Sequence, residues 1–306
     1  MRYGLFPGCN MPAHRPDVEK AIRMSMPTLG VELVDIEGYV CCPALGTFAS
    51  CDEIGHMAVG GWNLSIAEGK ELDLMVECGS CYSSLRTARE HMLHDAKAKT
   101  EVDRILAVAE KKYEGRATVR HILDVLYHEV GIEQIRNSLE RNLEGLHAVV
   151  QYPCHTIFPN ELVGFDTPPA RPHILGDLVE ALGATVDHYS CEYLCCGGAG
   201  GFHRGATRQA RDFARRRFDA IKNETKADLI VVSCVTCLMY MDKVQTELSN
   251  GGAAYSIPVF DYNQLLALCQ GFDPQQVARV SDVPRDSVCE RITSLGTQTQ
   301  LPHQED

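Results

Sequence analysis

The chain has 306 residues, of which 45% are hydrophobic and 23% charged. This composition is typical of a soluble globular protein with room for two domains. The formal net charge of -12 argues against a nucleic-acid-binding protein, because such proteins usually carry a basic surface.

The first half of the chain alternates between predicted strands and helices. A strand over residues 2–6, a helix from Pro16 to the glycine at position 30, and a strand over 31–36 come first. A helix over 57–69 and a strand over 72–76 follow. The segment 83–130 is expected to be largely helical, with Val119 and Ile122 on one of its apolar helix faces. Residues 131–145 are expected to connect to the second half.

The second half repeats this order. We expect a strand over 147–152, a helix over 174–183 that ends at a glycine, a strand over 184–189, a long helix over 205–225 and a strand over 228–232. Asp73 and Asp228 begin equivalent strands. Strands that alternate with helices predict an α/β fold, here two pseudo-repeated Rossmann-like α/β domains, each with a short, mostly parallel sheet.

The expected domain boundaries follow from this repeat. Residues 1–145 form the first domain, with a helical insertion or linker over about 83–145, and residues 146–270 form the second. Residues 271–306 are expected to be a polar tail, disordered from Thr297 onward. The longest apolar run, 229–241, is interrupted by Ser233 and Thr236, so we expect no transmembrane segment.

Ten of the 14 cysteines form one pattern that occurs twice: a single cysteine, an adjacent pair and a CxxC motif. The gaps between these three elements are 31 and 35 residues in the first half and 40 and 37 in the second. Each element follows a predicted strand, and the carboxyl ends of parallel strands meet at one edge of a sheet. We therefore expect two clusters of five thiols: Cys9, Cys41, Cys42, Cys78 and Cys81, and Cys154, Cys195, Cys196, Cys234 and Cys237.

Four kinds of site use cysteines in this way. The N-terminal stretch does not fit a secretory signal, so we expect a cytoplasmic protein, in which structural disulfides are rare. A thioredoxin-like dithiol would leave three cysteines of each half unexplained. A structural zinc takes four ligands and would leave one over, although zinc stays open for one half. An iron–sulfur centre fits best, because an adjacent pair can serve different irons; a cubane with one spare cysteine is the alternative.

The doubled pattern resembles the CCG domains of the heterodisulfide reductase B-subunit family. The resemblance extends from Pro7-Gly8-Cys9 through Cys237, and the contexts Gly30-Val31-Glu32-Leu33-Val34-Asp35 and Tyr152-Pro153-Cys154-His155 are also similar. The first pair departs from the family pattern because Pro43 follows it, where Gly197 follows the second. This departure changes no ligand.

The resemblance implies two noncubane [4Fe-4S] clusters, one held by the five cysteines of each half. It implies a catalytic subunit that reductively cleaves a mixed disulfide, that of coenzyme M and coenzyme B in methanogens, between the two centres. The implied partners are the iron–sulfur C subunit and the flavoprotein A subunit of heterodisulfide reductase. Two other functions stay open: a sulfur-oxidising relative that acts on protein-bound sulfane sulfur, and a non-catalytic electron-transfer subunit, including a zinc-stabilised assembly subunit.

Several residues beside the cysteines are candidates for further roles. His155 follows Cys154 and is a candidate proton donor to a leaving thiolate, although a hydrogen bond to sulfur or backbone is the simpler explanation. Gly197 and Gly198 are expected to let the backbone approach the cluster closely and to direct the amides of a following helix at its negative charge.

An arginine stripe and four other cysteines have simpler interpretations. Four arginines at helical spacing would suit an anionic substrate or an acidic partner, but a solvated face is the simpler hypothesis. These are Arg204, Arg208, Arg211 and Arg215. The remaining cysteines are expected to be small buried side chains, with Cys191 an alternative ligand. They are Cys51, Cys191, Cys269 and Cys289.

Overall fold

The computed structural model describes residues 1–44, 47–198, 205–249, 252 and 255–295. The first half contains β1 (Arg2–Phe6), α1 (Asn10–His14), α2 (Pro16–Thr28), β2 (Glu32–Asp35), α3 (Glu53–Gly69), β3 (Leu74–Val76), α4 (Gly79–His94), α5 (Ala96–Val108), β4 (Val119–His121), α6 (Ile122–Val125), the π-helix η1 (Leu126–Val130) and α7 (Ile132–Asn137).

The second half repeats the alternation of strands and helices. It contains β5 (His147–Gln151), the 3-10 helix η2 (Cys154–Thr156), α8 (Asn160–Val163), α9 (Ile174–Ala181), β6 (Thr185–Val186), α11 (Thr207–Glu224), β7 (Leu229–Val232), α12 (Val235–Ser249), β8 (Val259–Asp261), α13 (Tyr262–Cys269), α14 (Pro274–Val277) and α15 (Asp286–Leu295).

The strands form two parallel four-stranded sheets of matching order. The first sheet runs β2-β1-β3-β4 and the second β6-β5-β7-β8. Leu74 of β3 pairs with Gly4 of β1, and Leu229 of β7 pairs with Ala148 of β5, one residue after the equivalent aspartates. The predicted α/β fold with a pseudo-repeat is therefore confirmed, and each strand of one sheet has a counterpart in the other.

The fourth strand of the first sheet differs from the sequence prediction, and that of the second, β8, was not predicted. Val119, expected on a helix face, lies in β4 and pairs with Leu74 of β3. The helix begins only at Ile122, because the His121 side chain accepts a hydrogen bond from the backbone N–H of Leu123 and caps it. Three residues are too few for a periodic signal, so pairing along a buried sheet edge decides the conformation. Residues 132–137 of the expected connection form helix α7.

Residues 271–295 do not form the expected polar tail. They contain α14 and α15, and Val277, Val283 and Ile292 are buried in the core. Arg285 from this segment lies 3.9 Å from the carboxylate of Asp17 in α2. The predicted disorder from Thr297 lies outside the described residues.

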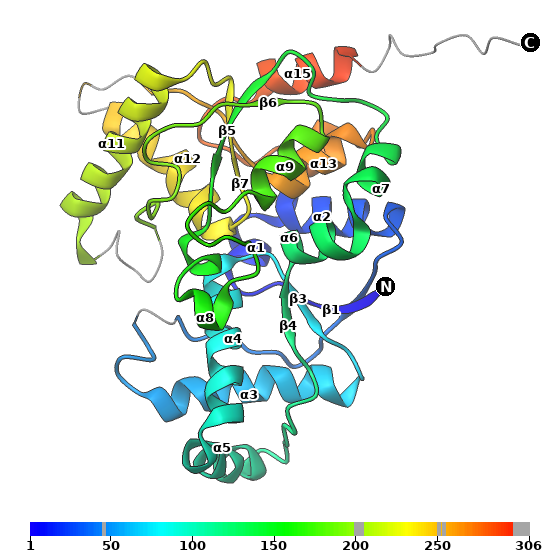
Figure 1. The fold of residues 1–306 in the computed structure, drawn as a ribbon, viewed down its shortest axis with the longest axis vertical. Coiled ribbons are helices and arrows are strands. Elements are labelled where there is room, and N and C mark those ends of the chain that lie inside the picture. The colour runs from blue at the N-terminus through cyan, green and yellow to red at the C-terminus, as the bar shows by residue number, and fades with distance from the viewer. Residues whose placement is uncertain (45–46, 199–204, 250–251, 253–254, 296–306) are drawn as a thin grey trace, which may run out of the picture.

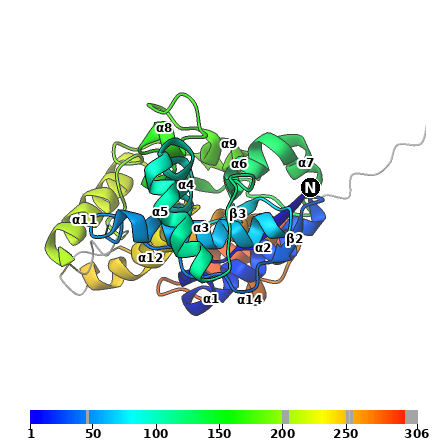
Figure 2. The ribbon, with the colours of Figure 1, turned by 90° about the horizontal axis from the view of Figure 1, so that it is seen from below.

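The two halves pack against each other through their long helices. Helix α2 of the first half contacts α13 of the second, and α4 contacts both η2 and α12. Figure 1 shows the sheets along the long axis, with α3 and α5 at one end and α15 at the other, and Figures 1 and 2 both place α11 on the flank opposite α7. The contact of α4 with η2 and α12 brings the cysteine-bearing ends of the two sheets together.

Candidate functional site

The ends of the strands and the starts of helices position the ten cysteines. Cys9 follows β1, and Cys78 and Cys234 follow the central strands β3 and β7. Gly8 turns the chain into the first of these positions with a φ of +64°, and a Cβ there would lie 2.9 Å from Cys81 Sγ. This position therefore needs glycine on two grounds, since a side chain would strain the backbone and collide with a thiol.

The five thiols of the first half form a chain of neighbouring sulfurs. Cys41 interacts with both Cys9 and Cys42. Cys42 Sγ lies 3.0 Å from Cys81 Sγ, and Cys81 in turn contacts Cys78. Cys9 and Cys41 are exposed, whereas the other three are buried, so the chain runs from the surface into the protein.

The second half has the same arrangement. Cys154 interacts with Cys195, Cys195 with Cys196, Cys196 with Cys237, and Cys237 with Cys234. Cys154 and Cys195 are half-buried, and the other three are buried. Each predicted cluster of five thiols is thus brought together in space, and both run from an accessible end to a buried one.

The two chains of sulfurs meet where the halves meet. Cys78 Sγ lies 3.8 Å from Cys234 Sγ, and this contact joins the thiols of one half to those of the other. Thr236 Oγ1 lies 3.5 Å from Cys78 Sγ and accepts a hydrogen bond from Asn10 Nδ2 at 3.3 Å. All ten cysteines consequently belong to one continuous site.

Backbone dipoles favour negative charge at both CxxC motifs. Each motif lies at the N-terminus of a long helix, α4 after Cys78 and α12 after Cys234. The backbone N–H of Gly197 donates to Cys195 Sγ at 3.3 Å, and that of Gly198 donates to Cys196 Sγ at 3.4 Å. These two amides belong to the loop itself and not to a following helix, and Gly197 has a φ of +93°. The predicted role of the two glycines at a cluster stays a prediction.

The thiols compete for protons because they lie so close together. Donation from Cys41 and Cys81 lowers the pKa of Cys42 to about 5, and donation from Cys154 and Cys196 lowers the pKa of Cys195 to about 2. Donation to Cys195 conversely raises the pKa of Cys196 to about 11. Five thiolates this close repel one another, so full ionisation of either group requires bound cations.

The chemistry of the donor set suits an iron–sulfur centre. Each group offers five sulfur ligands at a helix N-terminus, one more than a tetrahedral zinc ion can take. Ser80, inside the first CxxC, has a buried hydroxyl without a partner in the described part of the chain. An added sulfide would give that hydroxyl an acceptor. Sulfur-only ligands, helix N-termini and this hydroxyl therefore all fit such a centre.

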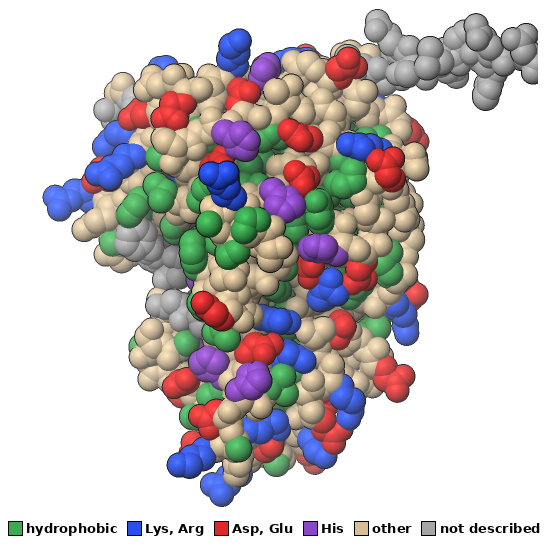
Figure 3. Space-filling view, in the orientation of Figure 1, with side chains coloured by type: hydrophobic (Ala, Val, Ile, Leu, Met, Phe, Trp, Pro, Cys, Tyr) green, Lys and Arg blue, Asp and Glu red, His purple; other side chains and the backbone are tan. Residues whose placement is uncertain are grey.

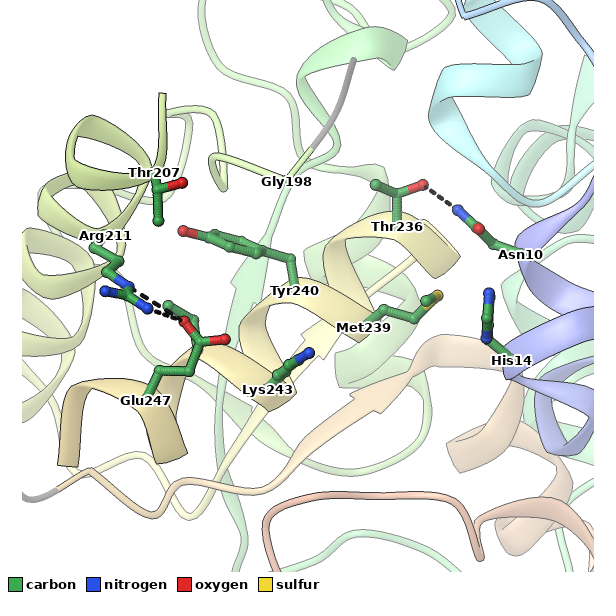
Figure 4. Close-up of a pocket in the computed structure, with 11 residues that line it drawn as sticks. Asn10, His14, Gly198, Thr207, Arg211, Thr236, Met239, Tyr240, Lys243 and Glu247 are labelled. Carbon is green, nitrogen blue, oxygen red and sulfur yellow. Dashed lines mark hydrogen bonds and ion pairs between the residues drawn. The ribbon is translucent and has the colours of Figure 1, made fainter. Parts of the chain in front are cut away.

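Two cavities lie beside the thiols. A cavity of about 340 Å³ is lined by all five cysteines of the first half and by Thr236 of the second. A neighbouring cavity of about 480 Å³ shares Asn10, Gly198 and Thr236 with it. Figure 4 shows His14 and Lys243 on opposite elements of this second cavity, with Arg211 paired to Glu247 at its far side. The shared wall connects the thiols to a pocket that contains cationic side chains.

His155, the predicted proton donor, does not line either of the two cavities beside the thiols. His155 lies in η2 after Cys154, but it lines a separate depression with Phe158 and Pro159. Its Nδ1 atom is buried without a partner in the described part of the protein. Its catalytic role stays a prediction.

The arginine stripe is largely a solvated, paired face. Arg211 pairs with Glu247 at 2.9 Å and Arg215 with Asp212 at 3.2 Å. Arg208 is exposed, and Arg204 lies outside the described residues.

The remaining cysteines follow the sequence expectation with one exception. Cys269 and Cys289 are buried and Cys191 is half-buried, but Cys51 is exposed, so the prediction that it is buried was wrong. It belongs to a turn before α3, and its side chain is accessible to solvent. Cys191 contacts Ser190 Oγ at 3.8 Å, and its role as an alternative ligand stays a prediction.

Sequence reasoning missed a buried acidic pair at the junction of the halves. The Glu77 carboxyl, directly before Cys78, accepts a hydrogen bond from the backbone N–H of Val235 at 3.1 Å and contacts the carboxyl of Asp261. Burial and the Asp261 carboxyl raise the pKa of Glu77 well above its usual range. The sequence offered one signal for this pair, because the acidic Glu77 directly follows the apolar strand Leu74–Val76.

The face of the molecule drawn in Figure 3 carries both kinds of charge. On the face drawn in Figure 3, basic and acidic side chains are intermixed rather than gathered into one basic field. Among the described residues, no helix is long and apolar enough to cross a membrane.

Comparisons with known proteins agree with the geometry. Residues 3–86 and 148–242 match the family described as "Cysteine-rich domain", CCG. The chain is 41% identical over 294 residues to a protein of Archaeoglobus profundus whose name likens it to the B subunit of heterodisulfide reductase. This match covers 95% of the chain and 98% of the relative.

Two further relatives cover most of the chain. It is 33% identical over 277 residues to the B subunit of the ferredoxin/F(420)H(2)-dependent CoB-CoM heterodisulfide reductase of Methanosarcina acetivorans, covering 90% of this chain and 91% of the relative. It is 29% identical over 280 residues to the "8-methylmenaquinol:fumarate reductase membrane anchor subunit" of Wolinella succinogenes, covering 90% of this chain and 94% of the relative.

Proposed function

This chain belongs to the heterodisulfide reductase B-subunit family, and from that premise we propose that it is the subunit of an oxidoreductase complex that cleaves a disulfide by reduction. The cofactors we propose are two noncubane [4Fe-4S] clusters, one for each group of five cysteines. The substrate class we propose is a mixed disulfide of two different thiols, of which the coenzyme M–coenzyme B disulfide is the first to test.

The observation that carries this proposal is the continuity of the ten thiols across the two halves. A single iron–sulfur relay would need one group of cysteines, whereas two groups that approach to 3.8 Å at Cys78 and Cys234 suit a reaction at two neighbouring centres. Reduction of R–S–S–R′ consumes two electrons and two protons and yields RSH and R′SH. Two centres can divide that demand, so that each delivers one electron.

When bound, the two clusters would supply those electrons and Lewis-acidic iron that stabilises the thiolate products. The chain itself contributes the shape and charge of the space around them. The cavity of about 340 Å³ has all five cysteines of the first group in its wall, so it is the space that the first cluster would occupy, and the sulfur end of a substrate would approach it from the adjoining cavity.

The organic part of the substrate would occupy the adjoining cavity of about 480 Å³. There the imidazole of His14 and the ammonium group of Lys243 face the cavity, and both residues are exposed, so an anionic group could reach them. The Asn10 amide and the Thr236 hydroxyl, already joined at 3.3 Å, form the wall that a bound disulfide would pass. This arrangement would orient an anionic disulfide with its sulfurs toward Cys78.

We propose that the electrons come from partner proteins, the iron–sulfur C subunit and the flavoprotein A subunit of heterodisulfide reductase. The chain has no flavin or nicotinamide fingerprint, so it needs an external donor. A cytoplasmic location belongs to the same proposal.

The test is to purify the protein without oxygen, measure its iron, zinc and acid-labile sulfide, and assay disulfide cleavage with a reduced viologen dye as electron donor. We expect iron and sulfide in excess of zinc, and thiol release from the coenzyme M–coenzyme B disulfide. C234S should lose the activity, whereas C269S changes a buried cysteine away from the thiol chains and should retain it. K243Q should raise KM more than it lowers kcat.

Three results would contradict the proposal. Zinc with little iron would remove its chemical basis. An iron-loaded protein that leaves disulfides intact but passes electrons to a quinone-linked partner would instead favour the electron-transfer function, which the similarity to the fumarate reductase subunit keeps open. Activity on a persulfidated carrier protein alone would favour the sulfur-oxidising function.

A further inference from the structure

One buried arginine in the second half has no acidic partner among the residues that the structure describes. Arg217 of α11 is 1% exposed, and its Nη2 atom donates to the backbone carbonyls of Leu194 at 2.6 Å and Cys195 at 3.1 Å. Its Nε and Nη1 atoms are buried without hydrogen-bond partners in the described part of the chain, and the side chain that approaches it is the neutral phenol of Tyr189. Burial of a guanidinium group without a counter-charge is costly, so the protein is expected to use that charge.

The other buried arginines of the described chain differ from it. Arg15 lies 2.9 Å and Arg285 lies 3.9 Å from the carboxylate of Asp17. Glu192, the acidic residue of the loop that Arg217 contacts, is instead bonded to His188 at 3.0 Å. Arg217 is therefore the buried cation that faces a cysteine loop rather than an acid.

The equivalent position in the first half is neutral. Trp62 of α3 precedes Asp73 by eleven residues, just as Arg217 precedes Asp228 by eleven. Its indole Nε1–H donates to the carbonyl of Gly38 at 2.9 Å, in the loop before the first cysteine pair. Both side chains thus hold the loop that leads into an adjacent cysteine pair, but only Arg217 is itself a fully buried cation. The cation nearest to Trp62 is the partly exposed Lys111, whose ammonium group lies 4.6 Å from the ring centroid.

We propose that Arg217 is a positioning and charge-compensating residue that makes the centre of the second half easier to reduce than that of the first. This inference rests on the proposed function, because it assumes that both centres are present. A centre held by thiolates gains negative charge on reduction, and a cation buried beside its ligands stabilises the reduced form. Trp62 offers no such stabilisation, so the first electron to arrive resides on the Cys195–Cys196 side.

The test is a redox titration of the oxygen-free, iron-loaded protein, followed by visible absorption and electron paramagnetic resonance. The native protein should show two separate one-electron steps. R217Q keeps a hydrogen-bond donor but removes the charge. It should lower the equilibrium constant of the reduction step at higher potential by at least tenfold, which is about 59 mV toward lower potential. R217K keeps the charge and should shift it by less than threefold.

W62F is the matched control in the first half. It removes the hydrogen bond to Gly38 without a change of charge, so the step that R217Q shifts should stay where it is in the native protein. Iron and sulfide are measured in every variant, so that a lost centre is not mistaken for a shifted one.

Each other outcome has a definite meaning. If R217Q and R217K shift the step equally, or if both lose the second centre, Arg217 only braces the loop and the proposal is overturned. If R217Q alone fails to retain iron, the test rests on R217K. A change of tenfold or more in the equilibrium constant of the higher-potential step of R217K would then overturn the proposal. Two intact centres with unchanged reduction steps in R217Q would overturn this inference alone. A native protein without iron and sulfide would instead refute the proposed function.

Discussion

Replacement of His121 by glutamine should make the stability of the protein less sensitive to acid. His121 is fully buried at the end of β4, where its Nε2–H donates to the carbonyl of Glu77 at 2.8 Å, since Nδ1 accepts from the Leu123 N–H at 3.3 Å. Its ring stacks on Phe165 of the second half with centroids 5.5 Å apart. Burial lowers the pKa of His121 to about 4, from its usual value of 6.5.

The sign and size of the effect follow from proton binding. Below about pH 6.5 the unfolded chain takes up a proton at this position that the native protein does not. Stability that is present above pH 6.5 is therefore lost as the pH falls toward the folded pKa of about 4. A pKa lowered from 6.5 to about 4 corresponds to about 3 kcal/mol of stability against unfolding. About 2 kcal/mol of this stability is lost by pH 5.

The assay is urea denaturation of the native protein and of H121Q at pH 7.5 and pH 5, with equal cluster content and without oxygen. H121Q loses the cap at Leu123 and should be about 1 kcal/mol less stable at pH 7.5. Between the two pH values the native protein should lose about 2 kcal/mol more than H121Q. H94Q controls for the removal of a histidine, because the His94 side chain is 79% exposed. Parallel losses in the native protein and H121Q would refute the reasoning.

Three other substitutions test the site and the core. G8A should lower the melting temperature and the iron content together, because a φ of +64° costs alanine about 1–2 kcal/mol and its Cβ would lie 2.9 Å from Cys81 Sγ; normal iron content would contradict the close approach. C234S should lose roughly half of the iron and acid-labile sulfide, one centre of two, whereas C289S, buried away from the site, should keep both. F260A in β8 should lower the free energy of unfolding by about 3–5 kcal/mol, whereas V108A, 88% exposed, should change it by less than about 0.5 kcal/mol; similar losses would mean that β8 is not part of the core.

The sequence predicts the repeat well because strand-ending cysteines and helix-ending glycines are local signals. The helix closed by Gly30 and the long helix before Asp228 both form within a few residues of their expected ends. The three-residue strands β4 and β8 carry no such signal. Val119 and Val259 become strand residues because a neighbouring strand offers pairing partners, and that neighbour comes from about 30–45 residues earlier in the chain.

Some parts of the site can be predicted from the sequence and others cannot. The thiols can be grouped from spacing alone, because parallel strands bring their carboxyl ends together. The approach of Cys78 to Cys234 depends on how the two halves pack, which no local pattern encodes. Arg217 was also hidden, since it follows Arg215 and Arg216 on a helix whose other arginines are exposed, and only the tertiary fold distinguishes it from them.

The two halves share their pattern of cysteines but not the side chains around it, and under the proposed function this difference bears on how a substrate binds. A site built from two identical halves would bind a mixed disulfide equally well in either orientation, and each centre would receive each sulfur half of the time. Matched positions with different charge or hydrogen-bonding capacity remove that equivalence, because they give the two orientations different free energies. Two such pairs lie at the junction: Glu77 with Ser233 before the CxxC motifs, and His121 with Asp261 at the ends of the fourth strands. A third, Trp62 with Arg217, contacts the loops that lead into the adjacent cysteine pairs. Duplication thus explains the ten cysteines, while divergence around them would give the proposed mixed disulfide a preferred orientation.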